Sequence, residues 1–127
     1  MIYLDSTTRV LQAVLASAVA ATQPICIVCF YDVISVQQTS QLEPHGATQI
    51  TATNNTTDVT ICSAPPVQGT IRNIKYINFF NRDTAAAIVT IKIDDAGTDS
   101  LILRESVPVN RGVVYQDGVQ WQTIGNT

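Results

Sequence analysis

The chain has 127 residues, a length that fits one domain whose hydrophobic core needs no disulfide or metal to hold it together. Only 13% of the residues are charged, against about 25% in an ordinary soluble domain, and the net charge is −3. With two lysines and five scattered arginines the chain has no basic stripe to neutralise phosphates, which argues against direct nucleic-acid binding.

Neutral side chains must make up most of the polar surface, because the chain has 16 Thr, 10 Gln and 7 Asn. A partner can cover such a surface without stripping water from many ions, each of which costs several kcal/mol to bury. We therefore expect the protein to assemble with other subunits, including copies of itself, as a homo-oligomer (a dimer or a trimer). A charge-poor monomer is the alternative.

The N-terminal region predicts two strands, over residues 1–4 and 9–16, joined by turn residues 5–8. The second stretch is rich in Ala and its leucines recur at a helical spacing, so a helix over residues 9–21 is the alternative. An N-terminal hairpin or arm over residues 1–16 is a candidate for assembly contacts.

The apolar run at residues 10–21 is about 12 residues long, whereas a membrane-spanning helix needs about 20. It is preceded by Asp5 and a single basic residue, Arg9, which differs from the basic start of a signal peptide. We therefore expect an unprocessed protein that does not enter a membrane.

Residues 25–36 form a near-continuous apolar run, typical of a strand that is covered on both faces and lies centrally in a sheet. Asp32 interrupts this run and needs a partner or an exit to solvent. The polar residues 37–46, which include a proline and a glycine, form the longest predicted loop and a second candidate for partner contacts.

Two further strands are predicted over residues 47–53 and 58–63, with a turn at residues 54–57 between them. Residues 64–69 are a short, stiff connection and not a domain linker. The chain is therefore predicted to be a single domain over residues 1–127.

The second half of the chain alternates short Val- and Ile-rich runs with turn residues. The runs cover residues 71–80, 87–93, 101–107, 112–115 and 119–124. The Asn, Asp, Pro and Gly residues between them favour reversal of the chain, so this half predicts one β-meander. The whole chain is predicted to be an all-β module of about 8–10 short strands.

Three cysteines, Cys26, Cys29 and Cys62, together with His45, supply the donor types of a structural zinc site. In an extended strand, residues three apart point to opposite faces, so Cys26 and Cys29 are not expected to share an ion. We interpret the cysteines as small buried hydrophobes in the free thiol state. A disulfide between Cys62 and one of the other two is the alternative.

His45 is the only histidine, and no nucleophile motif accompanies it, so we interpret it as a solvated loop residue. The acidic residues 94–99 have their glycine at the fourth position, where an EF-hand calcium loop needs it at the sixth. We interpret them as a hairpin turn. No catalytic, metal-binding or cofactor-binding residue is predicted, and no enzymatic activity.

Tyr115 and Trp121 flank a tight turn at Asp117 and Gly118. We expect the two rings to pack together across this hairpin and to close the end of a sheet. An aromatic platform that binds sugars is the alternative.

Four segments resemble short structural proteins of tailed bacteriophages: residues 4–16, 81–98, 101–104 and 114–121. The resemblance implies a virion protein with a jelly-roll-like antiparallel β-sandwich. Related hairpins occur in capsid decoration proteins, head fibres and tail components, so the resemblance does not by itself fix the place on the particle.

The small size of the chain favours the capsid, because it has no fibrous repeat, no coiled-coil heptads and no separate receptor-binding tip. The leading hypothesis is a capsid decoration or cement protein, made in the cytoplasm of the bacterial host, that binds the outer shell and bridges major capsid proteins. The alternative is a tail, head-fibre or adsorption component that contacts the host surface, with Tyr115 and Trp121 as candidate contacts.

Overall fold

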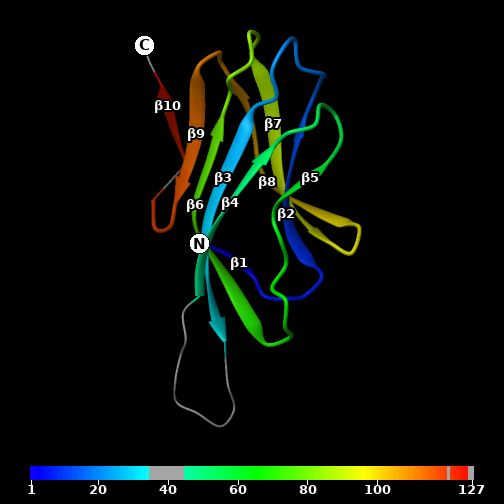
Figure 1. Cartoon of the computed structure of the whole chain (residues 1–127), viewed down its shortest axis with the longest axis vertical. Helices are drawn as coiled ribbons and strands as arrows, with labels where there is room; N and C mark the ends of the chain where they lie inside the picture. Colours follow the sequence, from blue (N-terminus) through cyan, green and yellow to red (C-terminus); the bar gives the residue numbers. More distant parts are fainter. Residues whose placement is uncertain (35–44, 120, 126–127) are drawn as a thin grey trace.

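The computed structural model describes residues 1–34, 45–119 and 121–125, which form a β-sandwich without helices (Figure 1). Ten strands build two antiparallel sheets that pack around one hydrophobic core, so the predicted all-β sandwich is confirmed. The jelly-roll order stays a prediction. The strands are β1 (Ile2–Leu4), β2 (Arg9–Leu15), β3 (Ile25–Ile34), β4 (His45–Ala52), β5 (Val59–Cys62), β6 (Thr70–Phe80), β7 (Ala87–Asp95), β8 (Thr98–Val107), β9 (Arg111–Gln116) and β10 (Gln122–Gly125).

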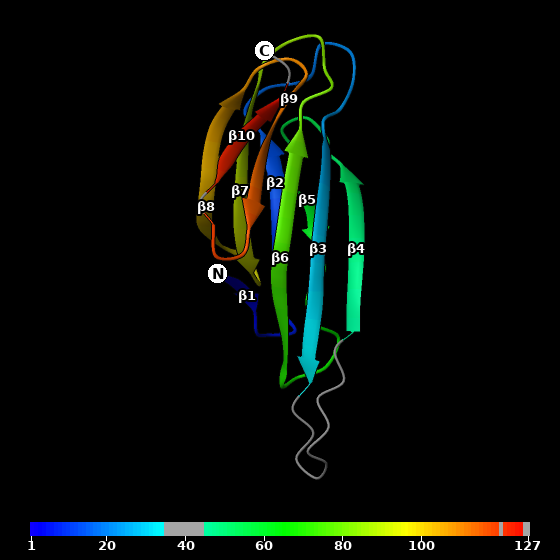
Figure 2. The same cartoon turned by 90° about the vertical axis from the view of Figure 1, so that its left-hand side faces the viewer.

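The larger sheet, sheet A, has six strands in the order β10–β9–β6–β3–β4, with β1 on the same edge of β6 as β9. The smaller sheet, sheet B, has four strands in the order β5–β2–β7–β8. Figure 2 shows β3 and β6 of sheet A lying over β2 and β5 of sheet B. The described residues contain no helix that is long and apolar enough to cross a membrane.

The predicted meander in the second half is wrong, because the chain changes sheet twice there. β6 belongs to sheet A, β7 and β8 form a hairpin in sheet B, and β9 and β10 form a hairpin back in sheet A. The fully buried Asn81 holds the two crossings together: its side-chain Nδ2 donates to the carbonyls of Ala85 and Val107, each at 2.9 Å. Asn110, at the second crossing, has the left-handed φ of 58° that favours Asn.

Residues 9–15 form a strand, so the helix considered for residues 9–21 is excluded over that stretch. The expected N-terminal hairpin over residues 1–16 is also wrong, because β1 pairs with β6 in sheet A while β2 pairs with β5 and β7 in sheet B. Leu4 and Leu11 are both fully buried. The two leucines therefore enter the core from opposite sheets, whereas a hairpin would have placed them in one sheet.

Strand β3 is central in sheet A, as predicted, because it pairs with both β4 and β6. It is not covered on both faces: Cys26 and Val28 are buried, while Ile25 and Ile27 point outward and are half-buried. Sheet B covers only the inner face of sheet A. The apolar run therefore includes an outer face that neither sheet of the described residues covers.

Other strand ends differ from prediction by a few residues. His45 and Gly46 begin β4, whereas they were predicted in the loop over residues 37–46. The rest of that loop lies outside the described residues. β8 begins at Thr98 because Ala96 and Gly97 alone make the turn, with left-handed φ values of 52° and 95°.

A buried ion pair joins β3 to β6. Arg72 donates from Nε to Asp32 Oδ1 at 2.8 Å and from Nη2 to Asp32 Oδ2 at 2.9 Å, a two-pronged geometry that is both strong and specific. Nη1 donates to the Ser63 carbonyl at 2.7 Å, which holds the segment after β5. Asp32 thus has the charged partner that its position requires, and its hydrogen bond raises the pKa of Arg72.

The carboxylate of Asp83 ties the loop after β2 to the first crossing between the sheets. It accepts hydrogen bonds from the backbone N–H groups of Thr22, Ala20 and Ala21, at 3.0, 2.8 and 2.8 Å. Because these donors stabilise the charged carboxylate, the pKa of Asp83 falls to about 2.

We expect Asp32→Asn to lower the free energy of unfolding by about 3–5 kcal/mol, because it leaves the guanidinium of Arg72 buried without its counter-charge. Urea unfolding, followed by the fluorescence of the single tryptophan Trp121, measures the change. The double variant Asp32→Leu with Arg72→Met removes both charges and should lose much less stability. An equal loss in the single and double variants would contradict this explanation.

Asp83 makes the stability of the fold depend on pH in the acid range. The pKa of Asp83 is about 2 in the folded protein and about 3.9 in an unfolded chain, so its stabilising effect is fully present above about pH 4. That effect is lost as the pH falls through the folded pKa. We expect Asp83→Asn to lower the melting temperature at neutral pH and to make it less dependent on pH below about 4. Circular dichroism melts across the acid range measure both curves, and parallel curves would count against the role of Asp83.

Candidate docking face

The three cysteines are free thiols that belong to the fold. Cys26 and Cys62 are fully buried, whereas Cys29 lies on the outer face of β3 with its Sγ 3.4 Å from Thr48 Oγ1. The prediction that Cys26 and Cys29 point to opposite faces is confirmed. Burial raises the pKa of Cys26 and Cys62 to about 12, so neither is poised as a nucleophile or a metal ligand.

The acidic residues 94–99 form a turn, as predicted: the Gly97 N–H donates to Asp94 Oδ1 at 3.0 Å between β7 and β8. Among the residues that the structure describes, no group of three or more His, Cys, Asp or Glu side chains could hold a metal ion.

The rings of Tyr115 in β9 and Trp121 just before β10 pack together across the hairpin, as expected. The ring centroids of Tyr115 and Trp121 lie 5.3 Å apart, and Tyr115 is buried in the core. A buried ring has no free face for a sugar. Tyr115 therefore offers no platform for a sugar, whereas Trp121 is half-buried.

The outer face of sheet A carries side chains without charge at the end where β3 begins. Cross-strand neighbours form three rows over β4, β3, β6 and β9. On β3 and β6 the residues between them, Cys26, Val28, Ile77 and Phe79, are buried, so the rows point away from the core. Val114, at the β9 end of one row, is only 6% exposed. We call these side chains the uncharged patch: Ile25, Ile27, Cys29, Thr48, Ile50, Ala52, Tyr76, Asn78, Phe80 and Val114.

The uncharged patch is large enough to serve as a contact. Three rows on four strands cover roughly 15–20 Å by 20 Å, the size of the functional patches on single-chain proteins. Ile50 is 63% exposed at its edge. The nearest charged residue on β6 is Lys75, at the bulge that follows the last row of the patch. Its charge is already neutralised, because its Nζ lies 2.7 Å from Asp117 Oδ2.

Charged side chains gather instead on and beside sheet B. They are Arg9, Asp58, Lys92, Asp94, Asp95, Asp99, Arg104 and Glu105, five acidic and three basic residues. Lys92 is held between Asp58 and Asp99, with Nζ at 2.9 and 2.7 Å from their carboxylates, and these bonds raise its pKa. The two outer faces of the sandwich therefore differ in chemistry.

Gly112 lets β9 and β10 lie close to β6 beside the uncharged patch. A Cβ at this position would stand 2.9 Å from the Phe79 carbonyl oxygen and 3.2 Å from Asn78 Oδ1. Only glycine fits at this position without moving β9 away from β6.

Sequence reasoning did not find the uncharged patch. Inward residues such as Cys26 and outward residues such as Ile27 are both apolar, so hydrophobicity does not say which of them is covered. The one clue is Asp32. Its side chain is buried with Arg72, and because side chains alternate along a strand, the other even-numbered residues of β3, such as Cys26, also point inward and the odd-numbered ones point outward.

Comparison of the chain with protein-family models, with curated proteins and with solved structures gave no match in any of the three. The candidate site therefore stands on its own geometry.

We expect Gly112→Ala to destabilise the fold by about 1–3 kcal/mol, because the added methyl group overpacks the contact between β6 and β9. Gly46→Ala is the matched control, since its Cβ would stand 3.6 Å from the Phe30 carbonyl oxygen, an ordinary contact. Urea unfolding compares the two variants. Equal stability of both would show that β9 has room to move.

Proposed function

We propose that this chain is a bacteriophage virion structural protein of the capsid decoration or cement class, which docks its uncharged patch on the major capsid protein. The resemblance to phage structural proteins supports the class. The observation that carries the docking surface is the absence of charge across the described outer ends of β3, β4 and β6, because such a surface is covered with little loss of ion hydration.

The proposed mechanism is mass action, without chemistry. A protein that binds only the assembled shell lowers the free energy of the shell relative to its separated subunits. A specific contact buries about 800 Å² per partner, so the patch would form the apolar centre of a contact with a polar rim. Each bound copy contributes a modest binding free energy, and many copies on one shell add up to a large stabilisation of the shell.

In this proposal the protein resides on the exterior of the virion, has no enzymatic activity, and forms a dimer or trimer at a symmetry axis of the shell. Its two-sheet core suits the task, because a rigid sandwich presents a fixed face. The alternative place on the particle is the tail or a head fibre. The number of copies per particle distinguishes the two places, since a shell protein is present in hundreds of copies and a tail protein in far fewer.

The test is binding of the purified protein to phage shells that lack it. We expect Ile50→Lys, which puts a charge into the uncharged patch, to reduce occupancy at least tenfold, equivalent to about 1.4 kcal/mol. Leu101→Lys is the matched control, since Leu101 is 66% exposed, close to the 63% of Ile50, but lies in sheet B. It should bind as the natural chain does.

Sedimentation of shells with bound protein gives the occupancy, and thermal melting of the shells gives the stabilisation. Equal binding by both lysine variants would overturn docking through the patch. No binding by the natural chain to any shell surface would overturn the decoration function itself.

A further inference from the structure

Two neighbouring hollows share Tyr3 in their lining, one over sheet A and the other lined mostly by sheet B. The first has a volume of about 460 Å³ and the second of about 410 Å³, each within the range of about 300–1,000 Å³ typical of small-molecule sites. Tyr3 is 43% exposed and stands between them. We call the pair the Tyr3 groove.

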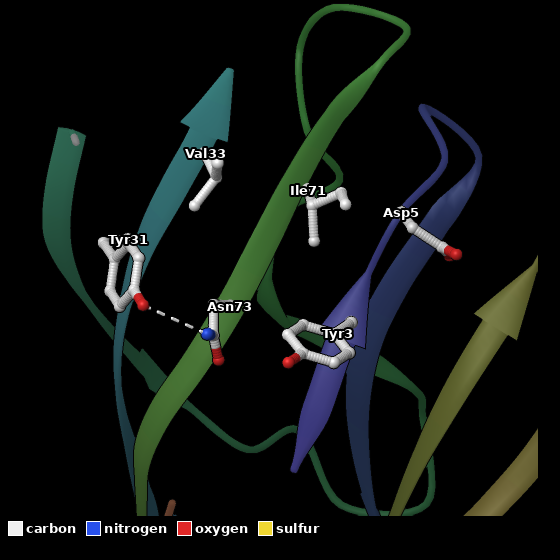
Figure 3. Close-up of a pocket in the computed structure, with 6 residues that line it drawn as sticks. All are labelled: Tyr3, Asp5, Tyr31, Val33, Ile71 and Asn73. Atoms are coloured by element: carbon white, nitrogen blue, oxygen red, sulfur yellow. Dashed lines mark hydrogen bonds between the residues drawn. The ribbon is translucent and has the colours of Figure 1, made fainter. Parts of the chain in front are cut away.

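The first hollow lies over β1, β6 and β3 (Figure 3). Tyr3, Asn73 and Tyr31 are cross-strand neighbours, so the two tyrosines stand on either side of the amide. Asn73 Nδ2 donates to the Tyr31 hydroxyl at 3.3 Å, which leaves the proton of that hydroxyl free to be donated. The next row along the same strands completes the lining, with Val33, Ile71 and Asp5.

The second hollow spans the open end between the two sheets. Its lining beside Tyr3 is polar, with Arg9, Asp95, Thr98 and Ser100, around one apolar side chain, Ile93.

The carboxylates of the groove are held in place as hydrogen-bond acceptors. Arg9 lies between Asp5 and Asp95, and its Nε donates to Asp95 Oδ2 at 3.0 Å. Thr8 donates to Asp95 Oδ1 at 2.6 Å, and these bonds lower the pKa of Asp95. Arg9 therefore holds both carboxylates in place, and Asp95 stays charged near neutral pH.

We propose that the Tyr3 groove binds a neutral oligosaccharide, with one sugar ring on each side of the Tyr3 ring. A pyranose ring has C–H groups on its faces, which pack on aromatic rings, and hydroxyls around its rim that both donate and accept hydrogen bonds. The groove matches this with the exposed ring of Tyr3 and with hydrogen-bond donors and acceptors in both hollows. Lys75 lies over the Tyr31 ring, with its Nζ 4.9 Å from the centroid, so Tyr31 offers its hydroxyl and not both ring faces.

The charged residues that line the groove are two carboxylates, Asp5 and Asp95, and one cation, Arg9. This excess of negative charge repels anionic sugars.

This inference does not rest on the proposed decoration function. The two sites share no residue: on β3 the Tyr3 groove uses Tyr31 and Val33, and the uncharged patch ends at Cys29, about 7 Å from Tyr31 along the strand. Substitutions can therefore alter one site without removing a side chain of the other. The two sites can therefore fail or succeed separately.

The experiment is titration of the isotopically labelled protein, followed by amide chemical shifts, with linear trisaccharides of glucose, galactose, mannose and N-acetylglucosamine. We expect at least one of them to shift the amides of Tyr3, Asn73 and Ser100 at millimolar concentration, equivalent to about 4 kcal/mol of binding. Tyr3→Ala should weaken binding at least tenfold. Tyr76→Ala is the matched control in the uncharged patch and should leave binding unchanged.

Melting temperatures of both variants show that each is folded before the titration. Absence of shifts with all four trisaccharides, shifts confined to residues outside the groove, or undiminished binding by Tyr3→Ala would each overturn the proposal. Sialyllactose, an anionic sugar, serves as a further probe and should bind more weakly than the best neutral sugar. Tighter binding of sialyllactose would overturn the assignment to neutral sugars.

Discussion

The buried ion pair between Arg72 and Asp32 decides which way sheet A faces. A charge in the core needs a partner, so these two side chains must meet on the inner face. Because side chains alternate along a strand, their neighbours Tyr31 and Asn73 then point outward. Shifting one strand by a single residue would separate the charges and exchange its inner and outer faces. The register that exposes both the uncharged patch and the Tyr3 groove is therefore tied to this pair.

The strands themselves could be predicted from the local sequence, because β-branched residues favour an extended backbone and turn residues mark where each strand ends. The pairing of strands could not. Nothing within residues 71–93 says that the chain leaves one sheet at Asn81 and enters the other, since that depends on hydrogen bonds from Asn81 to residues as far away as Val107. The proposed hairpin at residues 1–16 failed for the same reason: the burial of Leu4 depends on β6, far along the chain.

The candidate surfaces escaped prediction for two different physical reasons. In the uncharged patch, outward residues such as Ile27 have the composition of core residues, so only three-dimensional coverage distinguishes them. In the Tyr3 groove, Tyr3, Tyr31 and Asp95 come from three separate strands, and no spacing in the sequence relates them. What could be anticipated was the contact between Tyr115 and Trp121, because one hairpin brings the two residues together.

The unequal division of charge between the two sheets has a consequence if the proposed decoration function is right. A copy docked by its uncharged patch would turn sheet B, with its excess of carboxylates, toward the surrounding liquid. Repeated over a shell, this orientation would give the particle a negative coat, and like-charged coats repel one another over about a Debye length, about 8 Å at physiological ionic strength. The same sandwich that adheres on one side would thus act on its other side as a colloidal stabiliser, keeping neighbouring particles dispersed in low salt and letting them cluster as the salt concentration rises.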